Sequence, residues 1–372
     1  MIRALFSAAT FCLFASATVV PVPAQAQASD FPTFTVYDEP LFPDVTPSFR
    51  ISFAYLDPPN PFIANEHAQC VVFKNVVERG SQGDVLVECF PAGALGNEVS
   101  MIEQAEIGAI QAFIVAEGAV PALFPEVQVL ALPYAFRDHA HAYHVLDGAF
   151  GQKLKGAILD ASGFRVLALA ENGGFRNFTS NRAVRSADDI EGQSFRTMNH
   201  PGHMAIVNSL GGSATPIPWP ELYTALETGV IDGQENPVPV INFGRLYEVQ
   251  DYLILDGHVY SLDFLFMPED FFETLPPQYQ ELVLAAGQQS AVVARGINRI
   301  LEWEALGRFE RDGSFVEITV PSADERAVFA ERTQQPFLDW YHSSVDPGQV
   351  WSTKLREAIA DAEAHFRGDR GF

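Results

Sequence analysis

Short apolar runs alternate with helical spacing along the first half of the chain. Continuous apolar runs at 49–56, 85–90 and 107–115 are typical of strands that are buried on both faces. Apolar residues at helical spacing fill the interval that ends at Gly80, and 98–106 has a second helical pattern. Strands that alternate with helices in this way predict an α/β domain with a mostly parallel sheet.

The same pattern restarts in the second half. Residues 165–170 and 193–196 predict strands, and Pro220 suits the first turn of a helix that ends near Gly229. The longest helical pattern covers 277–310, which is roughly 50 Å of helix. Because that exceeds the width of one small domain, we expect this helix to bridge two lobes. The residues expected on its buried face are Leu282, Ala286, Val293, Ile297, Ile300 and Leu301.

The first 28 residues have the features of a secretory signal peptide. Arg3 precedes an apolar run over 4–20, and small-x-small sites predict cleavage after Ala26 or Ala28. No later stretch reaches the roughly 18 apolar residues of a membrane-spanning helix. We therefore expect an exported, periplasmic protein that does not insert into the membrane.

Charge narrows the possible partners. The formal net charge is −24, so the surface repels nucleic acid and anionic membranes, and neither is expected as a partner. The same surface repels a free carboxylate. An anion site must therefore be built locally from a few cations.

Two cysteines, Cys70 and Cys89, follow the predicted signal peptide. In an oxidising compartment such a pair can form a disulfide. Two buried thiols that pack as small apolar groups are the alternative. The sequence leaves both open.

Known catalytic motifs are missing from the sequence. It has no nucleotide-binding glycine fingerprint, P-loop, Gly-x-Ser-x-Gly elbow or His-Glu-x-x-His. His139, His141 and His144 form the densest histidine cluster, but no cysteine is near and a solvated helix face explains them better than a metal site. We expect no cofactor, no metal and no enzyme activity.

The most specific motifs lie within 173–261. They are Gly-Gly-Phe-Arg-Asn-Phe-Thr at 173–179, the segment that ends in Ser-Phe-Arg at 194–196, Glu-Leu-Tyr-Thr-Ala-Leu at 221–226 and Asp-Gly-Gln-Glu-Asn-Pro at 232–237. With Pro91 to Gly96 and Leu132-Pro133-Tyr134, this order closely resembles the solute-binding proteins of tripartite ATP-independent periplasmic (TRAP) transporters, the DctP family. The resemblance covers nearly all of the chain after the signal peptide.

The resemblance implies a two-lobed α/β periplasmic solute-binding protein (class II-like) with a long helix spanning both lobes. It implies a receptor that captures a small organic acid and delivers it to the membrane permease subunits. After the signal peptide (1–28) and an N-terminal extension (29–47) we expect two lobes. Lobe I takes 48–172 and 262–300, and lobe II takes 173–261 and 301–372.

The resemblance also implies the site residues. Arg196 would hold the ligand carboxylate in a two-pronged salt bridge, for which the planar guanidinium is better suited than an ammonium. Its alternative is a structural pair with one of the many acids. Arg176 would assist at the carboxylate, or else form a lobe–lobe or surface ion pair.

Five further residues are weaker candidates for ligand contacts. Asn236 offers a donor and an acceptor, Trp219 an aromatic surface and Glu117 acceptors for ligand hydroxyls. Tyr55 and Asn60 lie at the end of the first strand. A turn-stabilising asparagine, a core tryptophan and structural roles for the rest are the alternatives.

Two other functions stay open. An exported enzyme acting on an organic or sugar acid in the same cleft would need His200 or His203 as acid or base. A binding protein that feeds a signalling receptor would lack the permease partner. Glu235 is a metal ligand in some relatives, but we expect no metal here. Keto acids, hydroxy acids, dicarboxylates and sugar acids all remain possible ligands, with a modest monocarboxylate favoured.

Overall fold

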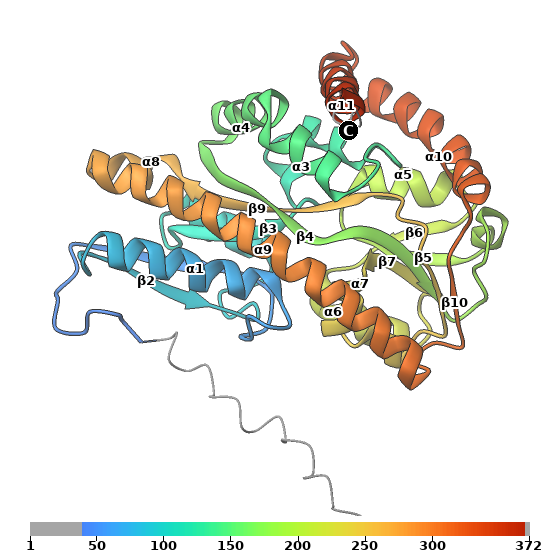
Figure 1. Ribbon diagram of the computed structural model, residues 1–372, viewed down its shortest axis with the longest axis horizontal. Helices are drawn as coiled ribbons and strands as arrows, with labels where there is room; N and C mark the ends of the chain where they lie inside the picture. Colours follow the sequence, from blue (N-terminus) through green and yellow to red (C-terminus); the bar gives the residue numbers. More distant parts are fainter. Residues whose placement is uncertain (1–38, 369–372) are drawn as a thin grey trace, which may run out of the picture. The chain divides into compact units, whose positions relative to one another are not determined.

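The computed structural model describes residues 39–368, and its strands form one continuous sheet (Figure 1). Along the main path the strand order is β2-β1-β3-β9-β4-β7-β5-β6, while β8 pairs with β4 and β10 pairs with β8. The strands are β1 (Phe49–Ala54), β2 (Val85–Phe90), β3 (Ala112–Ala116), β4 (Phe164–Ser180), β5 (Ser194–Thr197), β6 (Ser213–Pro216), β7 (Gly233–Pro237), β8 (Tyr252–Ile254), β9 (Tyr260–Pro268) and β10 (Glu317–Thr319).

The sheet is mixed, which corrects the expectation of a mostly parallel one. Within 39–368, β1 pairs in parallel with β2 and β3, β5 with β6 and β7, and β10 with β8. Strands β4 and β9 run antiparallel to their neighbours. The reason is that β9 returns from the second half of the chain and inserts between β3 and β4.

One long strand joins the two halves of the sheet. Over 164–175, β4 pairs with β9, and from Arg176 to Ser180 it pairs with β7. The sequence pattern predicted only 165–170 of this strand. The apolar cores fall on either side of the change in partner, which gives a two-lobed arrangement.

Helices cover both sides of the sheet (Figure 1). They are α1 (Asn65–Gly80), α2 (Glu98–Glu106), α3 (His139–Asp147), α4 (Ala149–Ser162), α5 (Pro201–Ser209), α6 (Trp219–Glu227), α7 (Val238–Phe243), α8 (Glu269–Thr274), α9 (Pro277–Asp312), α10 (Ala323–Ser344) and α11 (Val350–Gly368). Short 3₁₀ turns are η3 (Val120–Ala122), η4 (Pro125–Ala131), η5 (Ala187–Ile190) and η6 (Leu246–Glu248).

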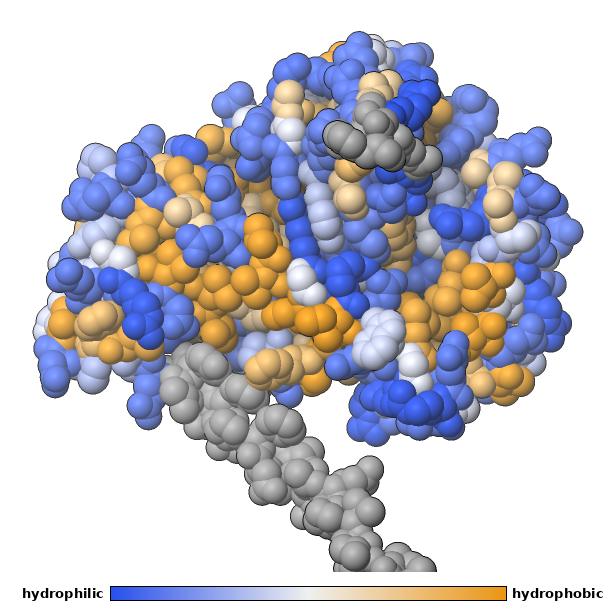
Figure 2. Space-filling model, in the orientation of Figure 1, coloured by the Kyte–Doolittle hydropathy of each residue, from blue (hydrophilic) through white to orange (hydrophobic). Residues whose placement is uncertain are grey.

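The long helix α9 confirms the prediction for 277–310, because it runs unbroken over 36 residues across both halves. Its buried face agrees only in part with the expected one. Ala286 and Leu301 are buried as predicted, Leu282, Val293 and Ile297 are half-buried, and Ile300 is 58% exposed. The helix packs through small residues such as Gly287, which lies against Leu167 of β4. Large apolar side chains such as Ile300 and Trp303 are exposed on this helix. Figure 2 shows further apolar surface, in orange, on the face of the molecule that carries α9 in Figure 1.

Two other boundaries differ from the expected ones. The strand expected over 107–115 begins only at Ala112, because Gly108 adopts φ +76° and turns the chain after α2. The last helix, α11, buries Trp351 and Leu355 in the same core as Leu154 of α4, among elements expected in lobe I. The lobe boundaries themselves stay a prediction.

The predicted signal peptide lies outside the described residues, and so do the first residues of the expected extension. Among residues 39–368, no helix combines the length and apolar character needed to cross a membrane. The described end of the extension contacts lobe I, where the Leu41 backbone N–H donates to Glu78 (2.8 Å) and Phe42 packs against Gly83.

The structure decides the cysteine question in favour of a disulfide. Cys70 on α1 and Cys89 on β2 are bridged, with their Cα atoms 6.1 Å apart. Both elements belong to the same α/β unit, so the bridge fastens the first helix to an edge strand of the sheet.

This disulfide should stabilise the fold by restricting the unfolded chain. For a sequence separation of 19 residues, loop-closure entropy predicts about 3 kcal/mol. We expect the Cys70→Ser/Cys89→Ser double variant to lose about that free energy of unfolding in urea titrations. A reductant should produce the same loss in the wild type and none in the double variant. Equal stability of oxidised and reduced wild type would contradict this role.

Candidate functional site

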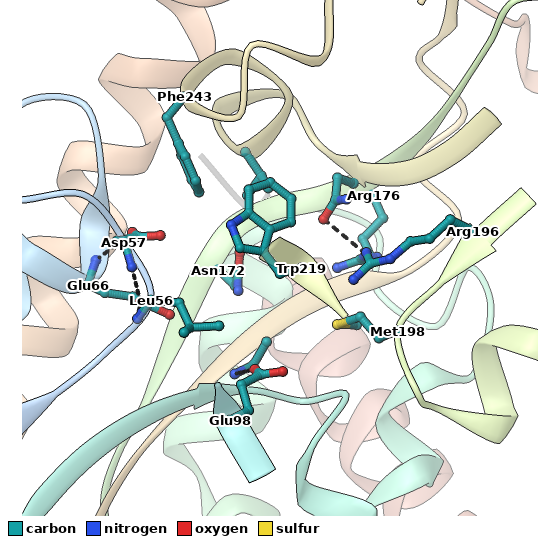
Figure 3. A pocket seen from close by; sticks show the side chains of 13 residues that line it. Leu56, Asp57, Glu66, Glu98, Asn172, Arg176, Arg196, Met198, Trp219 and Phe243 are labelled. Carbon is teal, nitrogen blue, oxygen red and sulfur yellow. Dashed lines mark hydrogen bonds between the residues drawn. The ribbon is translucent and has the colours of Figure 1, made fainter. Parts of the chain in front are cut away.

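A narrow cavity lies where the two halves of the sheet meet (Figure 3). Strand ends and helix starts from both halves contribute side chains to it. Its lining consists of Leu56, Asp57, Glu66, Glu98, Ala116, Asn172, Arg176, Arg196, Met198, Trp219, Asn236, Val240 and Phe243. The structure thus brings together four of the predicted site residues, namely Arg196, Arg176, Asn236 and Trp219.

Arg196 has a guanidinium that is fixed at one end and open at the other. It lies on β5, is 2% exposed, and its Nε donates to the Ile217 carbonyl (2.8 Å). Within residues 39–368 no carboxylate forms an ion pair with it. Burial lowers its pKa to about 10, and the nearby Arg176 charge adds to this effect. The terminal Nη groups therefore form a desolvated cationic fork at the cavity wall.

Arg176, in contrast, is fully engaged by the protein. Its Nε and Nη2 bind the Glu235 carboxylate, Nη1 donates to Ser261 (2.8 Å), and Nη2 also reaches Asn236 Oδ1 (3.1 Å). Burial opposes its charge, but Glu235 and Glu117 outweigh that effect and raise its pKa. Arg176 thus forms a buried ion pair within the expected lobe II, whereas the sequence left open a lobe–lobe or surface pair; its role at the ligand carboxylate stays a prediction.

Glu235 is the centre of a wider buried network. Besides Arg176 it contacts His203 Nδ1 (3.3 Å) and His258 Nε2 (3.4 Å), and His258 Nδ1 binds Asp256 (2.8 Å). Burial favours the neutral carboxyl, yet Arg176 and His203 hold the pKa of Glu235 well below its usual value. Burial lowers the pKa of His258, but Asp256 and Glu235 together raise it to about 9.

Trp219 and Asn236 also line the cavity. The Trp219 indole meets the Phe243 ring edge to face at 5.5 Å and lies directly on Gly244, where an added Cβ would come within 2.7 Å of it. Asn236 accepts from Arg176 and donates to Gln234 (2.5 Å). Its side-chain amide keeps one donor and one acceptor position for a ligand.

An acidic group faces the arginines across the cavity. In Figure 3, Asp57 and Glu66 lie on the side away from Arg176 and Arg196. Glu66 accepts from the backbone N–H groups of Leu56 and Asp57, each at 2.9 Å. Burial raises the pKa of Asp57 to about 7 and that of Glu66 well above its usual value, with Asp57 adding to the second shift.

Glu98 is a lining residue that the sequence gave no reason to select. It begins α2, where one carboxylate oxygen accepts from the Ala116 N–H (2.9 Å). Burial raises its pKa to about 7, against the opposing effects of that hydrogen bond and of Arg196. In so acidic a chain, one more glutamate after an asparagine cap carries no recognisable signal.

Three predicted contacts lie away from the cavity lining. Glu117 is buried behind it and accepts from the Ser261 hydroxyl (3.0 Å) and the Leu262 N–H (2.9 Å). Tyr55 points into the core and hydrogen-bonds His67. Asn60 caps the following turn through the Phe62 N–H (3.0 Å). Their ligand roles remain predictions.

The histidine clusters do not gather into a metal centre among residues 39–368, where no group of three or more potential ligands is placed to hold an ion. His139 contacts Glu171 (3.1 Å), and His144 stacks on His365 at 4.5 Å. His200 caps α5, and its Nδ1 accepts from the His203 N–H (3.2 Å). His200 and His203 are buried beside the cavity and do not line it.

With this geometry established, comparison with known proteins defines the family. The profile of bacterial extracellular solute-binding protein family 7, DctP, matches residues 62–343. The chain belongs to this family. Over 236 residues it is 39% identical to a solute-binding protein of Verminephrobacter eiseniae, covering 63% of this chain and 69% of the relative.

Solved structures of DctP-family proteins share the two-lobed fold. The sugar-acid-binding protein of Advenella mimigardefordensis in complex with galactonate is 31% identical, with a TM-score of 0.78 over 86% of this chain and 100% of that one. A TRAP solute-binding protein of Desulfovibrio salexigens with bound orotic acid is 28% identical, with a TM-score of 0.79 over 84% and 99% of the two chains.

The buried network makes the stability of this DctP-family protein depend on pH. The folded pKa of His258, about 9, lies above its usual unfolded value of about 6.5, so its stabilisation is complete below about pH 6.5 and is lost as the pH rises through 9. We expect a loss of about 2 kcal/mol between pH 7 and pH 9, because about half of the folded molecules still hold the His258 proton at pH 9.

Urea titrations at several pH values would measure this dependence. His258→Gln should be less stable at pH 7 and should show a flatter slope between pH 7 and pH 9. A wild-type stability that does not change over that interval would contradict a protonated His258 in the folded protein.

Proposed function

We propose that the protein is the extracytoplasmic receptor of a TRAP transporter, that it captures a small monocarboxylate on Arg196, and that it delivers this ligand to the membrane permease. The receptor binds its ligand without chemical change. The two lobes close over the ligand by bending where β4, β9 and α9 pass between them.

The open guanidinium of Arg196 is the observation that carries the proposal. Burying an arginine without a counter-charge is costly unless another anion completes the pair. Here Arg176 already has Glu235, so only Arg196 of these two cations has a terminal fork available. A carboxylate matches that fork with two parallel hydrogen bonds.

Known ligands of relatives support an organic acid. The Advenella protein binds galactonate, the Desulfovibrio protein binds orotic acid, and a relative from Escherichia coli, 34% identical over 61% of this chain and 69% of its own length, is the 2,3-diketo-L-gulonate-binding periplasmic protein. All three ligands carry one carboxylate together with further oxygen atoms. The enzyme alternative gains no support, because His200 and His203 do not line the cavity.

The cavity also indicates what the rest of the ligand carries. The carboxyl groups of Asp57 and Glu66 lie on the side of the cavity away from Arg196, and Glu98 adds a third carboxyl group to the lining. These groups accept hydrogen bonds and repel a second carboxylate. A hydroxyl on the ligand suits them, so we favour a hydroxy monocarboxylate, or the corresponding keto acid, over a dicarboxylate.

Substitution of Arg196 tests the carboxylate site. Arg196→Ala should weaken binding of a 2-hydroxy acid by about 30-fold or more, because the ligand charge then loses its buried partner. Arg196→Lys keeps the charge but loses the fork, and should also bind more weakly. Isothermal titration calorimetry measures both.

Arg176→Ala is the comparison variant, since it removes the second arginine of the cavity lining from the same sheet. Because it strands the buried Glu235 charge, it should cost about 3–5 kcal/mol of unfolding free energy. An Arg196→Ala variant that folds and binds as tightly as the wild type would place the carboxylate elsewhere.

Ligand charge provides a second test. At about pH 8, malate should bind at least about tenfold more weakly than 2-hydroxybutanoate, which has the same number of carbons, because its second carboxylate faces ionised Asp57 and Glu98. Their pKa values of about 7 predict that the difference shrinks as the pH falls below 7. Equal affinities at pH 8 would contradict the proposal that the carboxyl groups of the lining disfavour a second carboxylate on the ligand.

A further inference from the structure

A second and larger hollow adjoins the Arg196 cavity. It shares Leu56, Trp219 and Phe243 with the inner cavity. We call it the outer chamber. The rest of its lining is Pro58, Ala92, Gly93, Gly96, Asn97, Pro220, Leu222, Tyr223, Gly244 and Leu246.

The outer chamber differs chemically from the inner cavity. None of the residues of 39–368 that line it carries a charge, although charged residues make up 19% of the chain. The polar groups of its lining side chains are the Asn97 amide, the Tyr223 hydroxyl and the Trp219 indole N–H. Of these, Asn97 Oδ1 accepts from the Ser100 N–H (3.0 Å) and the Tyr223 hydroxyl donates to Glu248 (3.2 Å). A polar ligand group placed there would find few partners to replace water.

Three side chains line both the inner cavity and the outer chamber. Leu56 comes from the end of β1, and Trp219 and Phe243 come from α6 and α7 across the cleft. The indole is held in place by Phe243 and by the close approach of Gly244. A group attached to a ligand on Arg196 therefore leaves the polar cavity between apolar surfaces.

We infer that the outer chamber is a subsite for an apolar extension of the ligand, so that the receptor takes a hydroxy or keto carboxylate with an alkyl or aryl tail. This inference rests on the proposed function, because it needs the carboxylate on Arg196. Continuity with that site, supply of the lining by both sides of the cleft and the absence of charge among its lining residues favour this occupant. A polyhydroxylated tail has the opposite chemistry.

Affinity along a homologous series tests the inference. Each methylene that enters the chamber should strengthen binding about fourfold, so 2-hydroxyhexanoate should bind about 15-fold more tightly than 2-hydroxybutanoate. 3-Phenyllactate should also bind more tightly than 2-hydroxybutanoate. Galactonate, which has six carbons and one charge like 2-hydroxyhexanoate, should bind more weakly than it. Calorimetry at one pH and salt concentration compares all four probes.

A filled chamber provides the structural control. Ala92 is exposed and lines the chamber, so Ala92→Phe adds bulk there. Because its φ of +54° disfavours a bulky side chain, circular dichroism and the unfolding midpoint should first establish that the variant is folded. It should remove the advantage of 2-hydroxyhexanoate and leave 2-hydroxybutanoate within about twofold. Ala94→Phe, in the same turn but outside the lining, should change neither.

The outcomes separate the two proposals. Constant or falling affinity along the alkyl series, with binding that still depends on Arg196, would overturn the apolar subsite and leave the proposed function intact. Tighter binding of galactonate than of 2-hydroxyhexanoate would do the same. Binding of these acids that is unaffected by Arg196→Ala would overturn the proposed function itself.

Discussion

The ion pair between Arg176 and Glu235 determines the charge of the ligand cavity. Arg176 on β4 and Arg196 on β5 flank β7, the strand that carries Glu235. The two buried arginines repel each other, and Arg176 does lower the pKa of Arg196. Glu235 cancels the nearer charge, and His203 and His258 hold its carboxylate in place. Of the two arginines, only Arg196 then has no ion-pair partner among residues 39–368, which supports the proposed capture of a single carboxylate.

That local surplus explains how a chain with a net charge of −24 can hold an anion. Surface carboxylates act through water and salt, and their effect is largely screened beyond about 10 Å. The Arg196 fork acts inside a cavity where water is excluded and charge interactions are stronger. The same surroundings raise the pKa values of Asp57 and Glu98 to about 7, which limits the repulsion that these acids exert on the ligand near neutral pH.

The candidate site was predictable where sequence motifs and structure coincide. Arg176, Arg196, Trp219 and Asn236 belong to one stretch of the chain whose motifs resemble a known family, and all four line the cavity. The first half of the chain supplies residues without such a signal. Tyr55 and Leu56 are neighbours at the end of β1, and because successive side chains of an extended chain point to opposite faces, Tyr55 enters the core while Leu56 reaches the cavity. A prediction that is wrong by one position therefore selects the wrong face.

The fold was predictable where a hydrophobic period persists, as in α9. The prediction failed where polar residues and glycines of the candidate site interrupt that period, as in β4. Strand β4 extends far beyond the predicted 165–170. The prediction stopped early because Asn172, Gly173 and Gly174 are residues typical of a loop. The register shifts between Glu171 and Gly174, and both glycines have positive φ. This irregularity lies next to the point where β4 leaves β9 for β7, and it brings Asn172 and Arg176 to the cavity. The polar, glycine-rich sequence that conceals the strand is thus the same feature that builds the site, which is where local sequence rules are expected to fail.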